Sequence, residues 1–287
     1  MQAGPVFALL LAVIAIAAGT GQRIALSPER SGPQDLELSG DLPGLPKGAV
    51  RFVSYAELAS LPQRRFTVRD DANFPYGAEL SGVSLDDLIH RLGLADSGQL
   101  VAAVCDDKYE AHYPAEYRVA HSPILVLRID GKPAAEWPKA DGSSYGPFLI
   151  SHARFTPAFH ILSHTDEPQI PYGVLELKFL PQDEVLNALL PSAKYPMDSP
   201  VMQGYRIAFQ NCFRCHNEGA FGGQKAGVDW ETLAGVATGD PASFAATIHD
   251  PRARYASASM PGNPQYDTQT LHALTAYFQA FHRRGNR

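Results

Sequence analysis

The segment Cys212-Phe-Arg-Cys215-His216 constrains this chain of 287 residues more than any other feature. Its two thiols are separated by about one helical turn, and a histidine follows the second thiol directly. This spacing suits two thioether bonds to one edge of a porphyrin, with the histidine imidazole as a ligand of the iron. The same residues could also form a redox-active dithiol, part of a zinc site, a disulfide or a plain buried pair of cysteines.

The sequence on either side of the motif distinguishes among these possibilities. Before the cysteines, small and apolar residues recur at helical spacing, at Gly204, Ile207 and Phe209. After them comes Ser-Met260-Pro, and a last amphipathic helix is expected to follow the cap Asp267. This order of elements, from Val201 to Phe281, resembles a class I cytochrome c domain.

The resemblance implies roles for four residues. Cys212 and Cys215 would attach one haem c covalently, while His216 and Met260 would bind the iron from its two sides. Because both axial positions are then filled, such a domain transfers single electrons at its exposed haem edge and has no open position for oxygen. Three other side chains could replace Met260 by residue type alone: His249, Met197 and Met202.

Three aromatic or basic residues near the motif are expected to have structural roles. We expect Phe213 and Arg214, inside the motif, to be partly exposed spacers. Trp230 is expected to be a core side chain, the alternative being a hydrogen bond from its indole N–H to a haem propionate.

A second resemblance covers residues 66–179. Several phrases follow the order seen in the molybdopterin-binding domain of sulfite-oxidase type: Leu80-Ser-Gly-Val-Ser-Leu-Asp-Asp-Leu-Ile89, Val101 to Tyr117, Asp130-Gly-Lys-Pro133, Gly146-Pro-Phe-Leu-Ile150 and Pro171-Tyr-Gly-Val-Leu-Glu-Leu177. In that family a cysteine before the Gly-Val-x-Leu phrase binds molybdenum, whereas Phe66–Leu80 contains no cysteine. Cys105 lies in a later predicted strand and is expected to be a small buried hydrophobe. We therefore expect a cofactor-free relative of that fold, without molybdopterin.

The chain is expected to have two domains, a sheet-rich mixed α/β domain followed by an all-α domain. Helical and strand patterns predict one helix from the cap Ser84 to Leu92 and three strands, at Gln99–Cys105, Ile124–Ile129 and Val174–Phe179. The predicted divisions are a signal peptide (1–21), an extended lead-in (22–48), the α/β domain (49–180), a proline-rich linker (181–200) and the mono-haem cytochrome c domain (201–287).

The apolar run Val6–Ala18 predicts export to the periplasm. It is too short to span a bilayer comfortably, and Ala15-Ile-Ala17 is a small-residue cleavage pattern. A retained membrane anchor and a buried helix are the alternatives. After cleavage no stable membrane insertion is expected, because no later apolar run reaches membrane length. The net charge of −6 without a basic cluster excludes a nucleic-acid partner.

Three histidines of the predicted α/β domain could form a second site: His152, His160 and His164. A zinc or copper site is one reading, and solvated or packed histidines are the other. The spacing of His160 and His164 suits one face of a helix, but Pro157 and the strand-like surroundings argue against a helix there.

Three functions are compatible with the sequence. The first is an electron carrier whose α/β domain docks a redox protein or a small ligand. The second is a fused oxidoreductase whose α/β domain oxidises a small molecule and passes electrons to the haem. The third is a binding or sensor module in which the haem redox state changes partner affinity.

Overall fold

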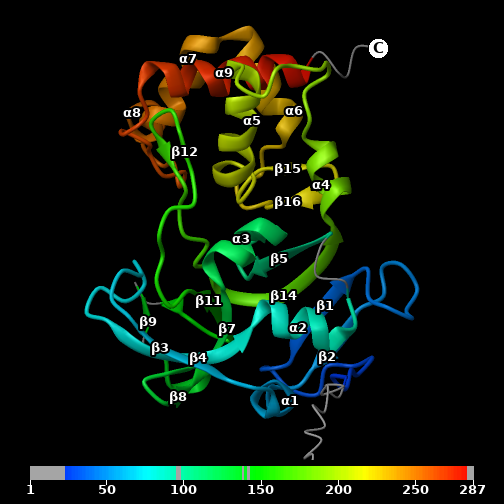
Figure 1. Ribbon diagram of the computed structural model, residues 1–287. Coiled ribbons are helices and arrows are strands. Elements are labelled where there is room, and N and C mark those ends of the chain that lie inside the picture. The colour runs from blue at the N-terminus through cyan, green and yellow to red at the C-terminus, as the bar shows by residue number, and fades with distance from the viewer. Residues whose placement is uncertain (1–22, 95–97, 138, 141–142, 283–287) are drawn as a thin grey trace, which may run out of the picture.

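A computed structural model describes residues 23–94, 98–137, 139–140 and 143–282 (Figure 1). The protein is mixed α/β, with a large mixed sheet followed by C-terminal helices. We call residues 23–181 the sheet region and residues 182–282 the helical region. The predicted signal peptide lies outside the described residues. Among the residues described, no helix has the length and apolar character needed to cross a bilayer.

The sheet is organised around its longest strand, β14 (Tyr172–Pro181). β1 (Leu36–Gly40) pairs with β14 in parallel, and β5 (Gln99–Cys105) pairs with it in antiparallel orientation. The strand order is β2-β1-β14-β11-β7-β4-β3, with β5, β6 and β8 paired off this path. The remaining strands of this sheet are β2 (Arg51–Val53), β3 (Arg64–Val68), β4 (Ala78–Ser84), β6 (Glu110–Tyr113), β7 (Ile124–Ile129), β8 (Lys132–Pro133) and β11 (Phe148–Ser151).

The three predicted strands are confirmed, since β5 and β7 have the expected bounds and β14 extends the third. The predicted extended lead-in, residues 22–48, contains strand β1, which pairs Leu38 with Leu177. This pairing joins segments far apart in the chain, and the sheet therefore begins earlier than residue 49.

Short helices cover the sheet. The predicted helix is confirmed as α2 (Leu85–Leu92): the Ser84 hydroxyl accepts from the Asp86 N–H at its start, and Gly93 ends it with φ of 75°. Such a positive φ suits glycine because glycine has no Cβ. The other helices here are α1 (Tyr55–Ser60), α3 (Ala115–His121) and the single 3₁₀ turn Ala134–Glu136. Two small hairpins complete the region: β9–β10 (Lys139–Ala140 and Ser143–Ser144) and β12–β13 (His160–Ile161 and His164–Thr165).

The helical region differs from the sequence-based expectation in two places. The predicted linker contains α4 (Gln182–Ala188), and Val185 and Leu189 are fully buried in the helical core. A short hairpin, β15–β16 (Asn217–Glu218 and Phe221–Gly222), occurs where only helices were predicted. The remaining helices are α5 (Pro200–Asn211), α6 (Trp230–Gly239), α7 (Pro241–His249), α8 (Pro251–Arg254) and α9 (Thr268–His282).

Helices α5 and α9 cross in close contact at Gly204. A Cβ atom added there would lie 2.0 Å from the Ala273 carbonyl oxygen and 2.8 Å from the Tyr277 Cβ. Glycine thus permits an approach that any side chain would block. Beside the crossing, the Trp230 indole N–H donates to the Tyr277 hydroxyl at 2.9 Å, which confirms Trp230 as a core residue.

The sheet and helical regions share one hydrophobic cluster. Leu100 and Ala102 of β5 and Ile161 of β12 are buried together with the aromatic side chains of the helical region. Figure 1 shows β5 and α3 on the side of the sheet region that faces the helices, and the β12–β13 hairpin extending alongside them. Part of the helical core is therefore supplied by the sheet region.

The helix crossing gives a direct test of packing. Gly204→Ala should lower the free energy of unfolding by about 1–3 kcal/mol, because overpacking outweighs the better helix propensity of alanine. The matched control is Gly235→Ala in α6, where an added Cβ meets nothing within 4 Å. This control should leave stability unchanged or raise it by up to about 1 kcal/mol. Equal urea unfolding midpoints for the two variants would contradict the close crossing.

Candidate functional site

The Cys212–His216 motif continues the last turn of α5. The Cys212 N–H donates to the Ala208 carbonyl at 2.8 Å, and the Cys215 and His216 N–H groups both donate to the Cys212 carbonyl, at 3.1 and 3.0 Å. The backbone therefore makes one more helix-like turn through the motif. This turn separates the two thiols as predicted and places the histidine directly after them.

A single hydrogen bond fixes the orientation of the His216 ring. Its Nδ1 atom lies 2.7 Å from the Val228 carbonyl oxygen, and a carbonyl can only accept, so Nδ1 carries the proton. The other nitrogen, Nε2, then has the lone pair. Burial lowers the pKa of His216, which keeps the imidazole neutral. A neutral imidazole held through Nδ1 is the form of histidine that binds a metal through Nε2.

None of the three cysteines forms a disulfide. Burial raises the pKa of Cys212 to about 12 and also raises that of Cys215, so both are protonated at neutral pH. A structural zinc site needs four ligands. Within the described part of the chain, His, Cys, Asp and Glu side chains form no group of three or more that could hold a metal ion.

Met260 lies in the segment between α8 and α9. It is half-buried and packs against the same hydrophobic cluster as Cys212. Asn263 holds this segment in place, because its backbone N–H donates to the His249 carbonyl at 3.0 Å and its side-chain amide donates to the Ile248 carbonyl at 3.1 Å. The other candidate ligands are placed differently: His249 is exposed at the end of α7, Met197 is 62% exposed and Met202 is buried within α5.

Of the two residues inside the motif, Phe213 is buried, contrary to the prediction of a partly exposed spacer, whereas Arg214 is partly exposed as predicted. Phe213 is fully buried and stacks on the His112 ring of β6, with centroids 4.6 Å apart. The Arg214 side chain is 12% exposed; its Nε donates to the Gln210 carbonyl at 2.8 Å, and its Nη2 lies 3.7 Å from a Glu167 carboxylate oxygen. Sequence reasoning missed the burial of Phe213 because its partner, His112, lies in the distant sheet region.

The motif is also held through its backbone. The Glu110 N–H of β6 donates to the Arg214 carbonyl at 2.9 Å, and the Gly223 N–H beside β16 donates to the Phe213 carbonyl at 2.9 Å. A Cβ on Gly223 would lie 1.9 Å from the Arg214 carbonyl oxygen, so this approach requires glycine. Nearby, Lys225 forms an ion pair with Asp107 in the turn between β5 and β6.

Glu110 interacts with two basic side chains beneath the motif; Glu110 and His112 are buried, and the Lys178 side chain is 27% exposed. The Glu110 carboxylate lies 2.9 Å from the His112 Nε2 atom and 3.0 Å from the Lys178 Nζ atom. Burial alone would raise the pKa of Glu110, but the hydrogen bond and charge of His112 and the charge of Lys178 hold it at about 2. The carboxylate therefore remains ionised in the folded protein.

The three predicted histidines have separate hydrogen-bond partners. His152 Nε2 lies 3.0 Å from the Tyr117 hydroxyl, and burial together with the nearby His121 lowers the pKa of His152 to about 3. His160 is exposed and bonds to Thr165 within the β12–β13 hairpin. His164 is fully buried and contacts Gln210 of α5. The hairpin confirms that His160 and His164 are not on a helix.

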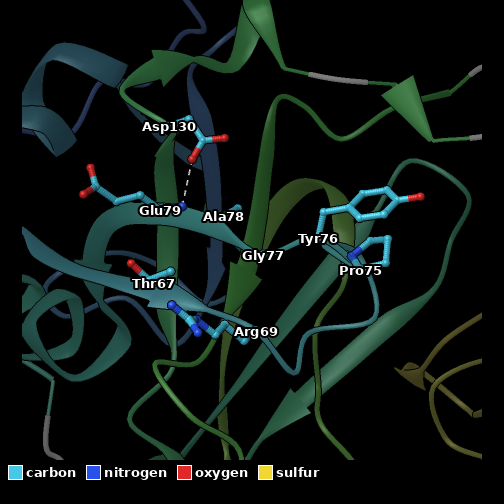
Figure 2. A pocket seen from close by; sticks show the side chains of 8 residues that line it. All are labelled: Thr67, Arg69, Pro75, Tyr76, Gly77, Ala78, Glu79 and Asp130. Atoms are coloured by element: carbon cyan, nitrogen blue, oxygen red, sulfur yellow. Dashed lines mark hydrogen bonds between the residues drawn. The ribbon is translucent and has the colours of Figure 1, made fainter.

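Residues of the Phe66–Leu80 segment, together with Asp130, line an open hollow of about 600 Å³ at the β3–β4 turn. Its lining contains no cysteine among the described residues; it consists of Thr67, Arg69, Pro75, Tyr76, Gly77, Ala78, Glu79 and Asp130. Figure 2 shows Asp130 bonded to the Glu79 backbone at one end and the fully exposed Tyr76 at the other. Cys105 is elsewhere, buried in β5, and burial raises the pKa of its thiol.

Comparison with known proteins leaves the family open. No family model matches the chain, and no curated protein matches it. Among solved structures, the sulfane dehydrogenase SoxCD from Paracoccus pantotrophus matches 51% of this chain and 38% of that chain, at 14% sequence identity and a TM-score of 0.34. At these values the likeness establishes neither a common fold nor a common activity.

The ionised state of Glu110 predicts a pH-dependent loss of stability. Since its folded-state pKa of about 2 is below the ordinary value of 4.5, the stabilisation is complete above about 4.5 and is lost as the pH falls towards 2. Glu110→Gln should therefore lower the free energy of unfolding by about 3 kcal/mol at neutral pH, and the difference from wild type should shrink between these two pH values.

Glu79→Gln is the matched control, because that carboxylate is at the surface, with 46% of its side chain exposed. Urea unfolding at pH values from neutral to 3 measures both variants. A difference for Glu110→Gln that stays constant with pH would contradict the ion pairs assigned to this carboxylate.

Proposed function

We propose that this chain is an exported mono-haem c-type cytochrome that transfers single electrons to or from a redox partner. The geometry of the motif carries the proposal: two thiols one turn apart precede a neutral histidine whose Nδ1–H is bonded to the Val228 carbonyl. Cys212 and Cys215 would hold the haem covalently, and His216 would bind the iron through Nε2. When bound, the haem supplies a one-electron iron couple.

The surrounding residues fit a large apolar group. Cys212, Phe221 and Met260 are half-buried and contact the same apolar cluster, beside the fully buried Phe213 and Trp230. These side chains would exclude water from the iron, and Val228 would keep the His216 ring in one orientation. We propose Met260 as the second iron ligand, because its segment is anchored through Asn263 and its rivals are exposed or lie inside a helix.

We further propose that the chain has two domains, an α/β domain of the sulfite-oxidase type and a cytochrome c domain, in the periplasm. The order of sequence phrases in residues 66–179 supports the first assignment. The missing cysteine and the mixed lining of the hollow, which includes Arg69, Glu79 and Asp130, support a cofactor-free domain that docks a redox protein or small ligand.

A fused oxidoreductase is the second candidate. The observation that favours it is the direct contact between the regions, since the Glu110 N–H bonds to the Arg214 carbonyl inside the motif. Elemental analysis of the exported protein separates the two candidates. Iron alone, near one atom per chain, supports the electron carrier, whereas stoichiometric molybdenum or copper in addition would support the oxidoreductase.

The iron ligands are tested by Met260→Ala in the exported protein. The variant should keep its covalent haem and gain carbon monoxide binding to the ferrous iron, because it lacks the thioether that would bind the iron. Its reduction potential should fall, and absorption spectra with a redox titration measure both effects.

Met197→Ala is the control, since that side chain is 62% exposed. It should exclude carbon monoxide as the wild type does. A Met260→Ala protein that also excludes carbon monoxide would show that another residue binds the iron.

A further inference from the structure

The β12–β13 hairpin extends from the sheet region into the helical region. Ile161 is buried in the helical core. The Ser163 N–H donates to the Thr270 hydroxyl at 3.0 Å, and the Ser163 hydroxyl accepts from the Asp267 N–H at 2.9 Å. The hairpin thus caps the first turn of α9, directly after the segment that carries Met260.

His164 of this hairpin bridges two elements that flank the proposed haem site. Its Nε2 bonds to the Gln210 side-chain oxygen in α5, two residues before Cys212. Its Nδ1 lies 2.9 Å from the hydroxyl of Tyr266, in the Met260 segment. Both hydrogen bonds of His164 are direct, and its side chain is fully buried away from solvent.

The directions of these hydrogen bonds are fixed by Asp166. Its carboxylate oxygen accepts from the Gln210 amide nitrogen at 2.5 Å, so the Gln210 oxygen faces His164. His164 therefore donates from Nε2 and accepts at Nδ1 from the Tyr266 O–H. On the other side, the Asn211 amide donates to the Tyr266 oxygen at 2.7 Å.

Asp166 also connects this network to the centre of the sheet region. His121 of α3 lies 2.8 Å from Asp166, and both side chains are 1% exposed. The buried network is thus continuous from α3 through Gln210 and His164 to Tyr266. When every donor in a buried network has its own acceptor, the side chains have one favourable arrangement. Moving one of them would leave a buried polar group without a hydrogen bond.

We propose that His164 is a positioning residue for the iron site, which holds the Met260 segment against the end of α5 and so keeps the Met260 thioether on the iron. The proposal rests on the proposed function. The sheet region thereby contributes to the haem site, because it supplies His164. This residue positions the Met260 segment and does not bind the iron itself.

His164→Ala in the full-length exported protein tests this role. The ferric protein should lose its sulfur-to-iron charge-transfer band, and the ferrous protein should bind carbon monoxide, which the wild type excludes, because the lost hydrogen bonds release the Met260 segment. His164→Gln should restore both properties, because its amide can donate to Gln210 and accept from Tyr266.

His160→Ala is the matched control, since His160 lies on the same hairpin but is exposed. It should behave as wild type. If His164→Ala is not recovered as a folded protein, Tyr266→Phe removes the hydrogen bond to His164 with little change of shape and should likewise bind carbon monoxide. Amide hydrogen exchange at Asn263 and Tyr266 should speed up in parallel.

The outcomes for the two proposals are distinct. A wild-type protein without covalent haem contradicts the proposed function. The role of His164 alone is contradicted by a different result. In that result the wild type has covalent haem and the sulfur band, and folded His164→Ala or Tyr266→Phe variants keep the band and exclude carbon monoxide.

Discussion

The contact between the Cys212–His216 turn and strand β6 is the interaction on which the rest of the structure depends. The turn offers its Arg214 carbonyl to the Glu110 N–H, and Phe213 stacks on His112. Because Phe213 is buried in this contact and the Arg214 carbonyl is bonded there, the position of the motif depends on the sheet region. The buried Glu110 carboxylate beneath the motif resists rearrangement, because separating it from His112 and Lys178 would leave an unpaired charge away from water.

This constraint explains why the two regions form one structure. The central strand β14 runs directly into α4, whose Val185 completes the helical core, and β5 contributes Leu100 to the same core. The β12–β13 hairpin reaches the opposite side of the helical region and contacts Tyr266 through His164. The proposed haem site is therefore held from two directions by the sheet region, through the large sheet and through the separate β12–β13 hairpin. This suits an electron carrier because a rigid site changes little between its two oxidation states.

Local pattern was sufficient for the elements whose signals lie within a few residues. The helix Leu85–Leu92 and the strand Ile124–Ile129 have the predicted bounds, because capping and apolar periodicity act over short distances. The thiol spacing was also correctly derived from helix geometry. The parallel strand Leu36–Gly40, the burial of Phe213 and the bridging role of His164 were not predicted, because each depends on a partner more than 40 residues away in sequence.

The most direct measurement of the central claim is peptide mapping by mass spectrometry of the protein purified from a host that exports it and attaches haem. The account predicts that the peptide containing Cys212–His216 carries the added mass of one haem, and that Cys212→Ser together with Cys215→Ser removes it. An unmodified peptide from the exported wild-type protein, with both cysteines free or joined to each other, would contradict the account.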